Sequence, residues 1–270
     1  MSAIRPPAVA GSFYPGESVV LRMTVDKLLR EVDEPAIAAR APKVLIVPHA
    51  GYVYSGPVAA TGFALLKAGR KSIRRVVLLG PAHRVYIRGV AIPEADAFAT
   101  PLGPVQLDHV LLAQLARHPR VVSSAPAHAA EHSLEVQLPF LQSALDDFLL
   151  VPLVVGEIDA HHLASLLEPI WGDDETLVVV SSDLSHYRAY DAAQAIDRAT
   201  VERIVALNAG LDHQQACGAT PINAALEIAG RRGLQARLIS MCNSGDTAGD
   251  RDRVVGYCAV AFEPQHDGRH

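Results

Sequence analysis

Residues 176–186 read TLVVVSSDLSH, an apolar run rich in β-branched side chains that passes directly into a polar segment ending in histidine. Continuous apolar runs of this length are typical of strands buried on both faces, as in a sheet covered by helices. The same pattern occurs at residues 43–52, KVLIVPHAGY, and at residues 75–83, RVVLLGPAH. Each of the three stretches therefore predicts a buried strand with a histidine in the loop that follows it.

Similar apolar runs continue along the chain, and most are separated by segments of helix length. The further predicted strands are residues 148–155, 236–241 and 254–262. The predicted helices are residues 18–32, 58–68, 108–117, 134–145, 160–170, 192–207 and 222–230. This alternation indicates the α/β class, here a layered fold with a largely parallel central sheet flanked by helices. The last two runs, joined by the polar residues 243–253, are predicted to form an antiparallel hairpin.

Composition limits the domain organisation and the classes of partner. No linker rich in Pro, Gly or Ser divides the 270 residues, so we expect a single domain over residues 1–262 and a disordered polar tail at residues 263–270. Lys and Arg number 24 against 29 Asp and Glu, a net charge of −5, which argues against binding to nucleic acid or to an anionic membrane. No apolar stretch approaches the roughly 18 residues of a membrane span.

Other sequence signals narrow the location and the chemistry. The N-terminus lacks the apolar core of a signal peptide, and the three cysteines contain no Cys-x-x-Cys pair, so we expect a cytoplasmic protein with reduced thiols. The phosphate-binding motifs of P-loop and dinucleotide-binding proteins are absent. The nucleophile elbow of α/β-hydrolases is absent as well.

The histidines that follow the predicted strands indicate a functional site. Ligands of parallel sheets bind beyond the carboxyl ends of the strands. Three separate strands deliver His49, His83 and His186 to that edge, with Asp183 beside them. A single histidine in such a loop is often structural, but three at one edge indicate a metal or catalytic site. Neutral imidazole is the commonest protein ligand of zinc, copper and iron.

Residues 131–135, EHSLE, supply two further candidates at the start of a predicted helix. His132 and Glu135 are three residues apart and share one helix face, a spacing that can chelate a metal. The alternative is a structural glutamate with a solvated histidine, and the sequence leaves both interpretations open.

Cys217 is the last candidate, in the segment CGATPI at residues 217–222. Thr220 and Pro221 are suited to the N-cap and the first position of a helix. We therefore expect the helix dipole to lower the pKa of the preceding thiol and to favour the thiolate that binds metals. The alternative is a small buried side chain, an interpretation that fits Cys258 and leaves Cys242 undecided.

Taken together, several motifs resemble the Memo family. They are PPAVAGSFYPG (6–16), PHAGYVY (48–54), GPAH (80–83), EHSLEVQLP (131–139), SSDLSH (181–186) and CGATPI (217–222), in the order that the family shows. The sequence resembles the bacterial and archaeal members of the family. These members are named for a link to AMMECR1-like and radical-SAM proteins (the AmmeMemoRadiSam system). It implies a fold similar to that of the LigB-type class III extradiol dioxygenases, which are non-haem iron enzymes.

The resemblance also implies roles for individual residues. It assigns metal binding to His49, His83 and Cys217, places Asp183 and His186 beside them, and puts His132 in the pocket wall. It implies iron or copper as the metal. A two-histidine-one-carboxylate face is usual for Fe(II) oxygenases, so a thiol as the third ligand departs from that pattern.

Three functions are consistent with these residues. The first is a metal-dependent oxidoreductase with Fe(II), or else copper, in which His186 is the acid or base and Asp183 orients either His186 or a metal-bound water. His132 is the third candidate catalytic residue of this function. The second is a non-catalytic module that binds a peptide or small molecule on a former dioxygenase scaffold. The third is a zinc hydrolase, in which zinc would activate water.

Overall fold

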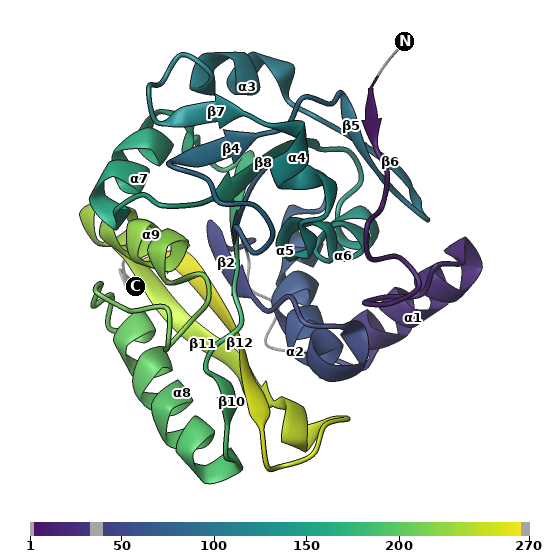
Figure 1. Ribbon diagram of the computed structural model, residues 1–270, viewed down its shortest axis with the longest axis vertical. Helices are drawn as coiled ribbons and strands as arrows, with labels where there is room; N and C mark the ends of the chain where they lie inside the picture. Colours follow the sequence, from purple (N-terminus) through teal and green to yellow (C-terminus); the bar gives the residue numbers. More distant parts are fainter. Residues whose placement is uncertain (1–2, 33–39, 266–270) are drawn as a thin grey trace, which may run out of the picture.

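The computed structural model describes residues 3–32 and 40–265. In this part of the chain, eight strands of a nine-stranded sheet run in the order β10-β12-β2-β9-β3-β8-β4-β7. The ninth strand, β11, lies outside this order and pairs with β12. Figure 1 shows helices α1, α2 and α6 on one side of this sheet and α7, α8 and α9 on the other. The expected α/β fold, with a central sheet flanked by helices, is confirmed.

The four central strands are parallel and contain the apolar runs from which they were predicted. They are β2 (Val44–Val47), β3 (Arg75–Pro81), β8 (Leu149–Val155) and β9 (Thr176–Ser181). β9 lies between β2 and β3, although it is far from both in the chain. This order brings the three histidine-bearing loops next to one another at the carboxyl edge.

The sheet is mixed around this parallel centre. β11 (Leu234–Asn243) and β12 (Val254–Pro264) form the predicted antiparallel hairpin. β12 also pairs antiparallel with β2, and β4 (Val90–Ile92) pairs antiparallel with β8. Glu263 and Pro264 were expected in a disordered tail, but they pair with the start of β11 and belong to β12. Residues 266–270 of that tail lie outside the described residues.

The shortest strands were not predicted from the sequence. β1 (Ile4–Arg5), β5 (Ala97–Thr100) and β6 (Gly103–Gln106) form a separate three-stranded sheet. β4, β7 (Val121–Ser123) and β10 (His186–Arg188) extend the main sheet. Strands of two to four residues are too short to show a hydrophobic period, and β6 contains glycine and proline, which are rare in strands.

Each predicted helix is present, although several ends differ. The helices are α1 (Ser18–Arg30), α2 (Tyr52–Ala64), α3 (His109–Leu115), α4 (Ala125–Ala129), α5 (His132–Glu135), α6 (Leu138–Ala144), α7 (Ala160–Leu167), α8 (Tyr190–Val205) and α9 (Ala219–Arg231), with short 3-10 turns η1 (Leu65–Gly69), η2 (Glu168–Ile170) and η3 (Ser244–Asp246). None of the described helices has the length and apolar character needed to cross a membrane.

Two helix boundaries matter for the site. The helix predicted over residues 134–145 is divided into α5 and α6, because Pro139 has no N–H to continue the hydrogen bonds of α5 and instead lies in the first turn of a new helix. Gln137, between the two helices, donates its side-chain amide to the Pro48 carbonyl and to Ser181. α9 begins at Ala219 with Gly218 as its N-cap, so the predicted Thr220 cap is wrong.

Candidate metal centre

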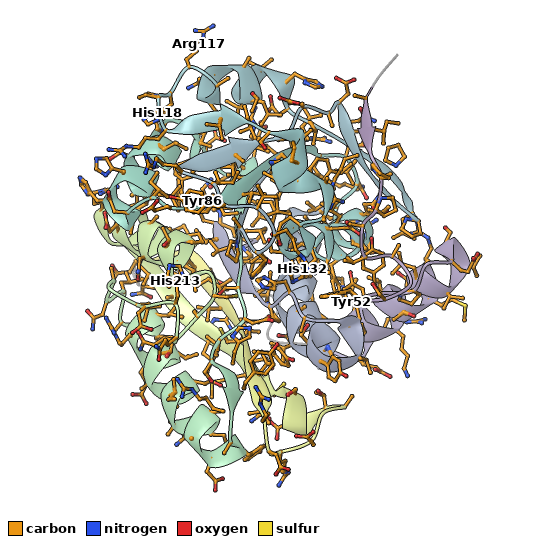
Figure 2. All side chains as sticks on the ribbon, viewed as in Figure 1. Tyr52, Tyr86, Arg117, His118, His132 and His213 are labelled. Atoms are coloured by element: carbon orange, nitrogen blue, oxygen red, sulfur yellow. The ribbon has the colours of Figure 1, made fainter. Side chains whose placement is uncertain are left out.

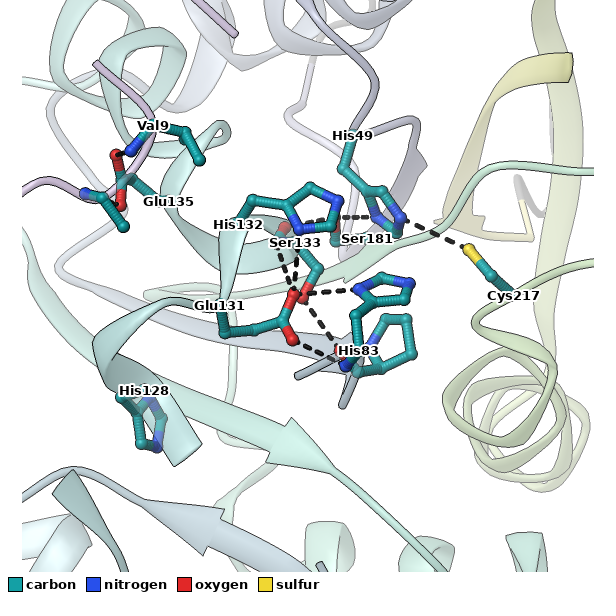
Figure 3. A network of polar contacts seen from close by, with 12 residues as sticks. Val9, His49, His83, His128, Glu131, His132, Ser133, Glu135, Ser181 and Cys217 are labelled. Atoms are coloured by element: carbon teal, nitrogen blue, oxygen red, sulfur yellow. Dashed lines mark hydrogen bonds and ion pairs between the residues drawn. The ribbon is translucent and has the colours of Figure 1, made fainter. Parts of the chain in front are cut away.

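Three imidazole rings meet beyond the carboxyl ends of β2 and β3. His49 lies in the short link between β2 and α2, His83 follows β3, and His132 is the first residue of α5. Their ring centroids are 5.2 Å (His49–His83), 5.4 Å (His49–His132) and 4.7 Å (His83–His132) apart. One nitrogen from each ring can be chosen so that all three lie within 4.8 Å of one another. Figure 3 shows this group with its hydrogen-bond partners.

The hydrogen bonds around His49 fix which of its nitrogens carries the proton. Ser181 Oγ donates its only proton to the Ser133 carbonyl at 2.5 Å and also accepts from the Gln137 side-chain amide at 2.8 Å. His49 Nδ1, which lies 2.9 Å from the same oxygen, must therefore be the donor. Nε2 of His49 therefore carries the lone pair of the ring, and it faces the Cys217 thiol, which lies within hydrogen-bond distance at 3.3 Å.

Glu131 fixes which nitrogen of His83 carries the proton. Its carboxylate accepts the His83 backbone N–H at 2.7 Å, His83 Nδ1–H at 2.9 Å and the Ser133 backbone N–H at 2.9 Å. Burial raises the pKa of Glu131, but these hydrogen bonds outweigh burial and lower that pKa to about 2. The ionised carboxylate holds the His83 ring and leaves Nε2 free, the usual arrangement around a metal-bound histidine.

His132 completes the group with a nitrogen that has no hydrogen-bond partner. Its Nδ1 is buried and unsatisfied within the described residues, at 3.4 Å from Glu131 Oε1. Phe13 packs against the ring at a centroid distance of 4.8 Å. Burial lowers the pKa of His132 to about 4 and holds the pKa of His49 well below its usual range, so both imidazoles are neutral at pH 7. Neutral imidazoles with free lone pairs fit a transition-metal ion.

Cys217 lies at the side of this group. Its Sγ is 3.3 Å from His49 Nε2 and 3.8 Å from Ser182 Oγ. Burial raises the pKa of the Cys217 thiol to about 12, so the expectation that the helix dipole would lower it is wrong. Desolvation of the charged form outweighs a helix dipole that is screened and acts over only one turn. A bound metal would have to displace the thiol proton.

Asp183 and His186 reach the same region from the loop after β9. Asp183 is buried, and its Oδ1 accepts the His49 backbone N–H at 2.7 Å. Burial raises the pKa of Asp183 to about 7. Among the described residues, Asp183 makes no hydrogen bond to His186. Its hydrogen bond to the His49 backbone orients His49 instead. Burial lowers the pKa of His186, the first residue of β10.

A hollow of about 600 Å³ connects these groups to the surface. His49, His83, His132, Asp183 and His186 all line it, which brings five of the six predicted site residues to one space. Aromatic side chains from Phe13, Tyr54, Tyr187 and Tyr257 form much of the remaining wall. We call this space the imidazole-side hollow.

Glu135 does not take part in the centre. Its buried carboxylate accepts hydrogen bonds from the Ala8 and Val9 backbone at 2.7 and 2.9 Å and from the Tyr14 hydroxyl at 2.6 Å, and it pairs with the Arg5 guanidinium. The structural interpretation of Glu135 is therefore correct. His132, by contrast, is half-buried within the group of imidazoles.

Sequence reasoning missed Glu131 and Ser181, which hold the imidazoles in place. Glu131 precedes α5 as its N-cap, and that position was the one available signal. His213, four residues before Cys217, lies 3.1 Å from the Cys217 carbonyl through its Nδ1. It therefore contacts the loop of Cys217 and does not join the imidazoles.

The sequence of this chain is similar to known proteins over almost its whole length. The sequence profile of the Memo-like protein family matches residues 5–261. A protein of Metallosphaera sedula described as a MEMO1 family protein is 35% identical over 96% of this chain and 99% of its own length. Proteins with the same description from Aquifex aeolicus (34%) and Methanopyrus kandleri (37%) match over 96% of this chain and over 99% and 98% of their own lengths. This chain therefore belongs to the Memo-like protein family.

Proposed function

We propose that this chain is a metal-dependent oxidoreductase in which His49, His83 and Cys217 bind iron(II), with His132 beside them. The observation that carries the proposal is the fixed pair of imidazoles: Ser181 and Glu131 each accept a hydrogen bond from Nδ1–H, so that Nε2 carries the lone pair that can bind a metal. Cys217 is the proposed third ligand because its Sγ lies 3.3 Å from His49 Nε2. The ion would supply a centre for electron transfer.

The protein's own residues would handle protons and binding. His186 lines the hollow, and its lowered pKa keeps it neutral at pH 7, so it can accept a proton from a bound molecule. Asp183 holds the His49 backbone and so fixes the ring that faces Cys217. The aromatic wall of the hollow would bind the organic substrate and exclude water from it.

Metal analysis of protein purified without a histidine tag tests the proposal. We expect about one equivalent of Fe(II) or another transition metal per chain, as a site of this donor set predicts. His83→Ala should lose the metal, while His162→Ala, a change at an exposed histidine on α7, should keep it. Less than about a tenth of an equivalent, with no uptake on adding Fe(II), copper or zinc, would contradict metal binding by this site.

The aromatic wall of the imidazole-side hollow favours a second candidate, a module that binds a peptide or small molecule without turnover. Oxygen uptake with Fe(II) and a panel of catechols separates the two functions. Sustained uptake that disappears in His186→Ala supports the oxidoreductase, while ligand binding without uptake supports the module. Ester or peptide hydrolysis that a chelator abolishes and zinc alone restores would instead indicate a zinc hydrolase.

A further inference from the structure

A second hollow, of about 560 Å³, lies on the other side of the candidate centre. It is formed by the segment after β3, from Pro81 to Ile87, by the end of β8, and by the loop that carries His213 and Cys217. Figure 2 labels Tyr86 and His213, which line this space, and His132, which lines the other. We call the second space the sulfur-side hollow.

The candidate centre forms the wall between the two hollows. His83 lines both of them. Cys217 lines only the sulfur-side hollow, whereas His49 and His132 line only the imidazole-side hollow. Because Cys217 Sγ is only 3.3 Å from His49 Nε2, the wall between the two spaces is a single pair of side chains at this point. A molecule in either hollow can therefore approach the centre, but each meets a different face of it.

The inner wall of the sulfur-side hollow is mostly apolar, and its backbone polar groups are already paired. Its apolar members are Pro81, Ala82, Val85, Ile87 and Val155. The Ala82 N–H donates to the Val155 carbonyl at 2.9 Å, and the Glu157 N–H donates to the Ile87 carbonyl at 2.7 Å. These hydrogen bonds leave few groups on this wall that could bind a polar ligand.

The polar side chains of the sulfur-side hollow are also engaged with one another. The Tyr86 hydroxyl hydrogen-bonds to the Glu157 carboxylate. His213 contacts the Cys217 carbonyl through Nδ1 and lies 3.4 Å from Thr220 Oγ1 through Nε2. Arg84 is the one charged side chain that lines both hollows. Apart from Arg84, the space offers little to hold a charged or extended molecule.

The wall has little freedom to rearrange. A Cβ atom on Gly156 would lie 2.1 Å from the Ile87 carbonyl oxygen, so the end of β8 and the segment before β4 are in direct backbone contact. Only glycine permits such an approach. Backbone packing thus fixes the part of the wall where Gly156 meets Ile87.

We propose that the sulfur-side hollow is a separate entrance through which a small uncharged molecule reaches Cys217 and His83, while the organic ligand occupies the imidazole-side hollow. The division of the site into two spaces rests on the geometry alone. That the small molecule is a co-substrate of the size of dioxygen rests on the proposed function.

Modification of the Cys217 thiol tests the entrance without requiring metal or turnover, because a methanethiosulfonate transfers its methylthio group to the thiolate as a mixed disulfide and releases methanesulfinate. Metal-free protein is treated with the small uncharged reagent methyl methanethiosulfonate at about pH 9, where more of the thiol is ionised, and Cys217 modification is followed by peptide mass spectrometry. Val85→Trp fills the sulfur-side hollow, and the matched change Val255→Trp fills the imidazole-side hollow. We expect Val85→Trp to slow modification by about tenfold or more, because thiol reactions depend on access. Val255→Trp should leave the rate within about twofold of the unmodified chain.

Three results would overturn the proposal: a rate unchanged by Val85→Trp, a larger effect of Val255→Trp, or no modification of Cys217 in the folded wild-type protein. Circular dichroism establishes that each variant is folded, and Ala82→Leu provides a second, smaller filling of the same hollow if Val85→Trp does not fold. A protein without metal or activity would contradict the proposed function and still give a labelling result, so the two failures are distinguishable.

Discussion

At the scale of single residues, the orientation of His83 depends on the carboxylate of Glu131. Glu131 accepts three N–H groups, two of them from His83. Glu131→Gln keeps the size of the side chain but replaces one accepting oxygen with a donor, so His83 loses its fixed orientation. We expect metal affinity to fall by about 10- to 100-fold, the range for the loss of such a partner.

Isothermal titration of the metal-free protein measures this loss. Glu263→Gln, which alters an exposed ion pair with Arg237 on the hairpin, is the matched control and should bind metal normally. Equal affinities for Glu131→Gln and the wild type would show that His83 does not need Glu131 to bind a metal.

The role of Cys217 makes a second prediction at this scale. If its sulfur is a ligand, a soft donor favours Cu(I) and zinc over harder ions. Cys217→Ser should therefore lower Cu(I) affinity by about tenfold or more, while Cys217→Glu should favour Fe(II) by restoring a carboxylate. Competition titrations of the three proteins measure both effects. Unchanged Cu(I) affinity in folded Cys217→Ser would make Cys217 an ordinary buried thiol.

The histidines near the centre could be predicted from the sequence, but the residues that hydrogen-bond to them and fix their orientation could not. His49, His83 and His186 could be identified because a strand end fixes where the next residues go. Glu131 and Ser181 could not, since the histidines that they hold lie 48 and 132 residues away from them in the chain. The pKa of Cys217 was misjudged because burial depends on the whole fold.

At the scale of secondary-structure elements, α8 supports the loop that follows β9. Asp197 on α8 is buried, and its Oδ1 accepts the Ser185 backbone N–H at 3.0 Å. The same loop pairs with Gly256 of β12, where an added Cβ would lie 1.9 Å from Asp197 Oδ2. The loop that carries Asp183 and His186 is thus fixed by a helix that contributes nothing else to the site.

Asp197→Ala leaves the Ser185 N–H buried and unpaired. We expect the free energy of unfolding to fall by about 1–3 kcal/mol, the cost of an unsatisfied buried group. Urea denaturation measures the change, and Glu202→Ala at an exposed position of the same helix should cost little. Should both variants unfold at the same urea concentration as the wild type, Asp197 does not support the loop.

The elements themselves could be predicted where they are long and uniform. The parallel centre and the hairpin follow from runs of β-branched residues, and most helices follow from apolar spacing. The division between α5 and α6 was not predicted, although Pro139, which has no N–H to continue a helix, marks it in the sequence. The short strands could not be predicted. Each of them forms a strand only because a neighbouring strand pairs with it in the fold.

At the scale of the whole molecule, His128 links stability to pH. It is buried away from the centre, its Nε2 bonds the Ala91 carbonyl at 3.0 Å, and its Nδ1 has no partner among the described residues. Burial lowers the pKa of His128 from 6.5 to about 4. Between these values the unfolded chain binds a proton that the folded chain does not, so the stability from this group is lost as the pH falls.

A variant isolates this contribution. The shift corresponds to about 3 kcal/mol once the pH is below 4. His128→Gln cannot titrate but can still donate to Ala91, so its stability should fall less steeply than that of the wild type between about pH 6.5 and 4. Urea denaturation across this range compares the two slopes. Parallel curves would show that His128 does not govern acid sensitivity.

The attachment of the first residues to Glu135 also constrains how the protein is made. Arg5 emerges from the ribosome early, yet its carboxylate partner lies 130 positions later in the chain. β2 likewise waits for β9 and β12 before both of its edges are paired. Such distant pairings form slowly. Cys217 is synthesised after all three imidazoles, so the ligand set that we propose would be complete only once translation has passed four-fifths of the 270 residues. On that proposal, a metal would enter the centre at the end of biosynthesis.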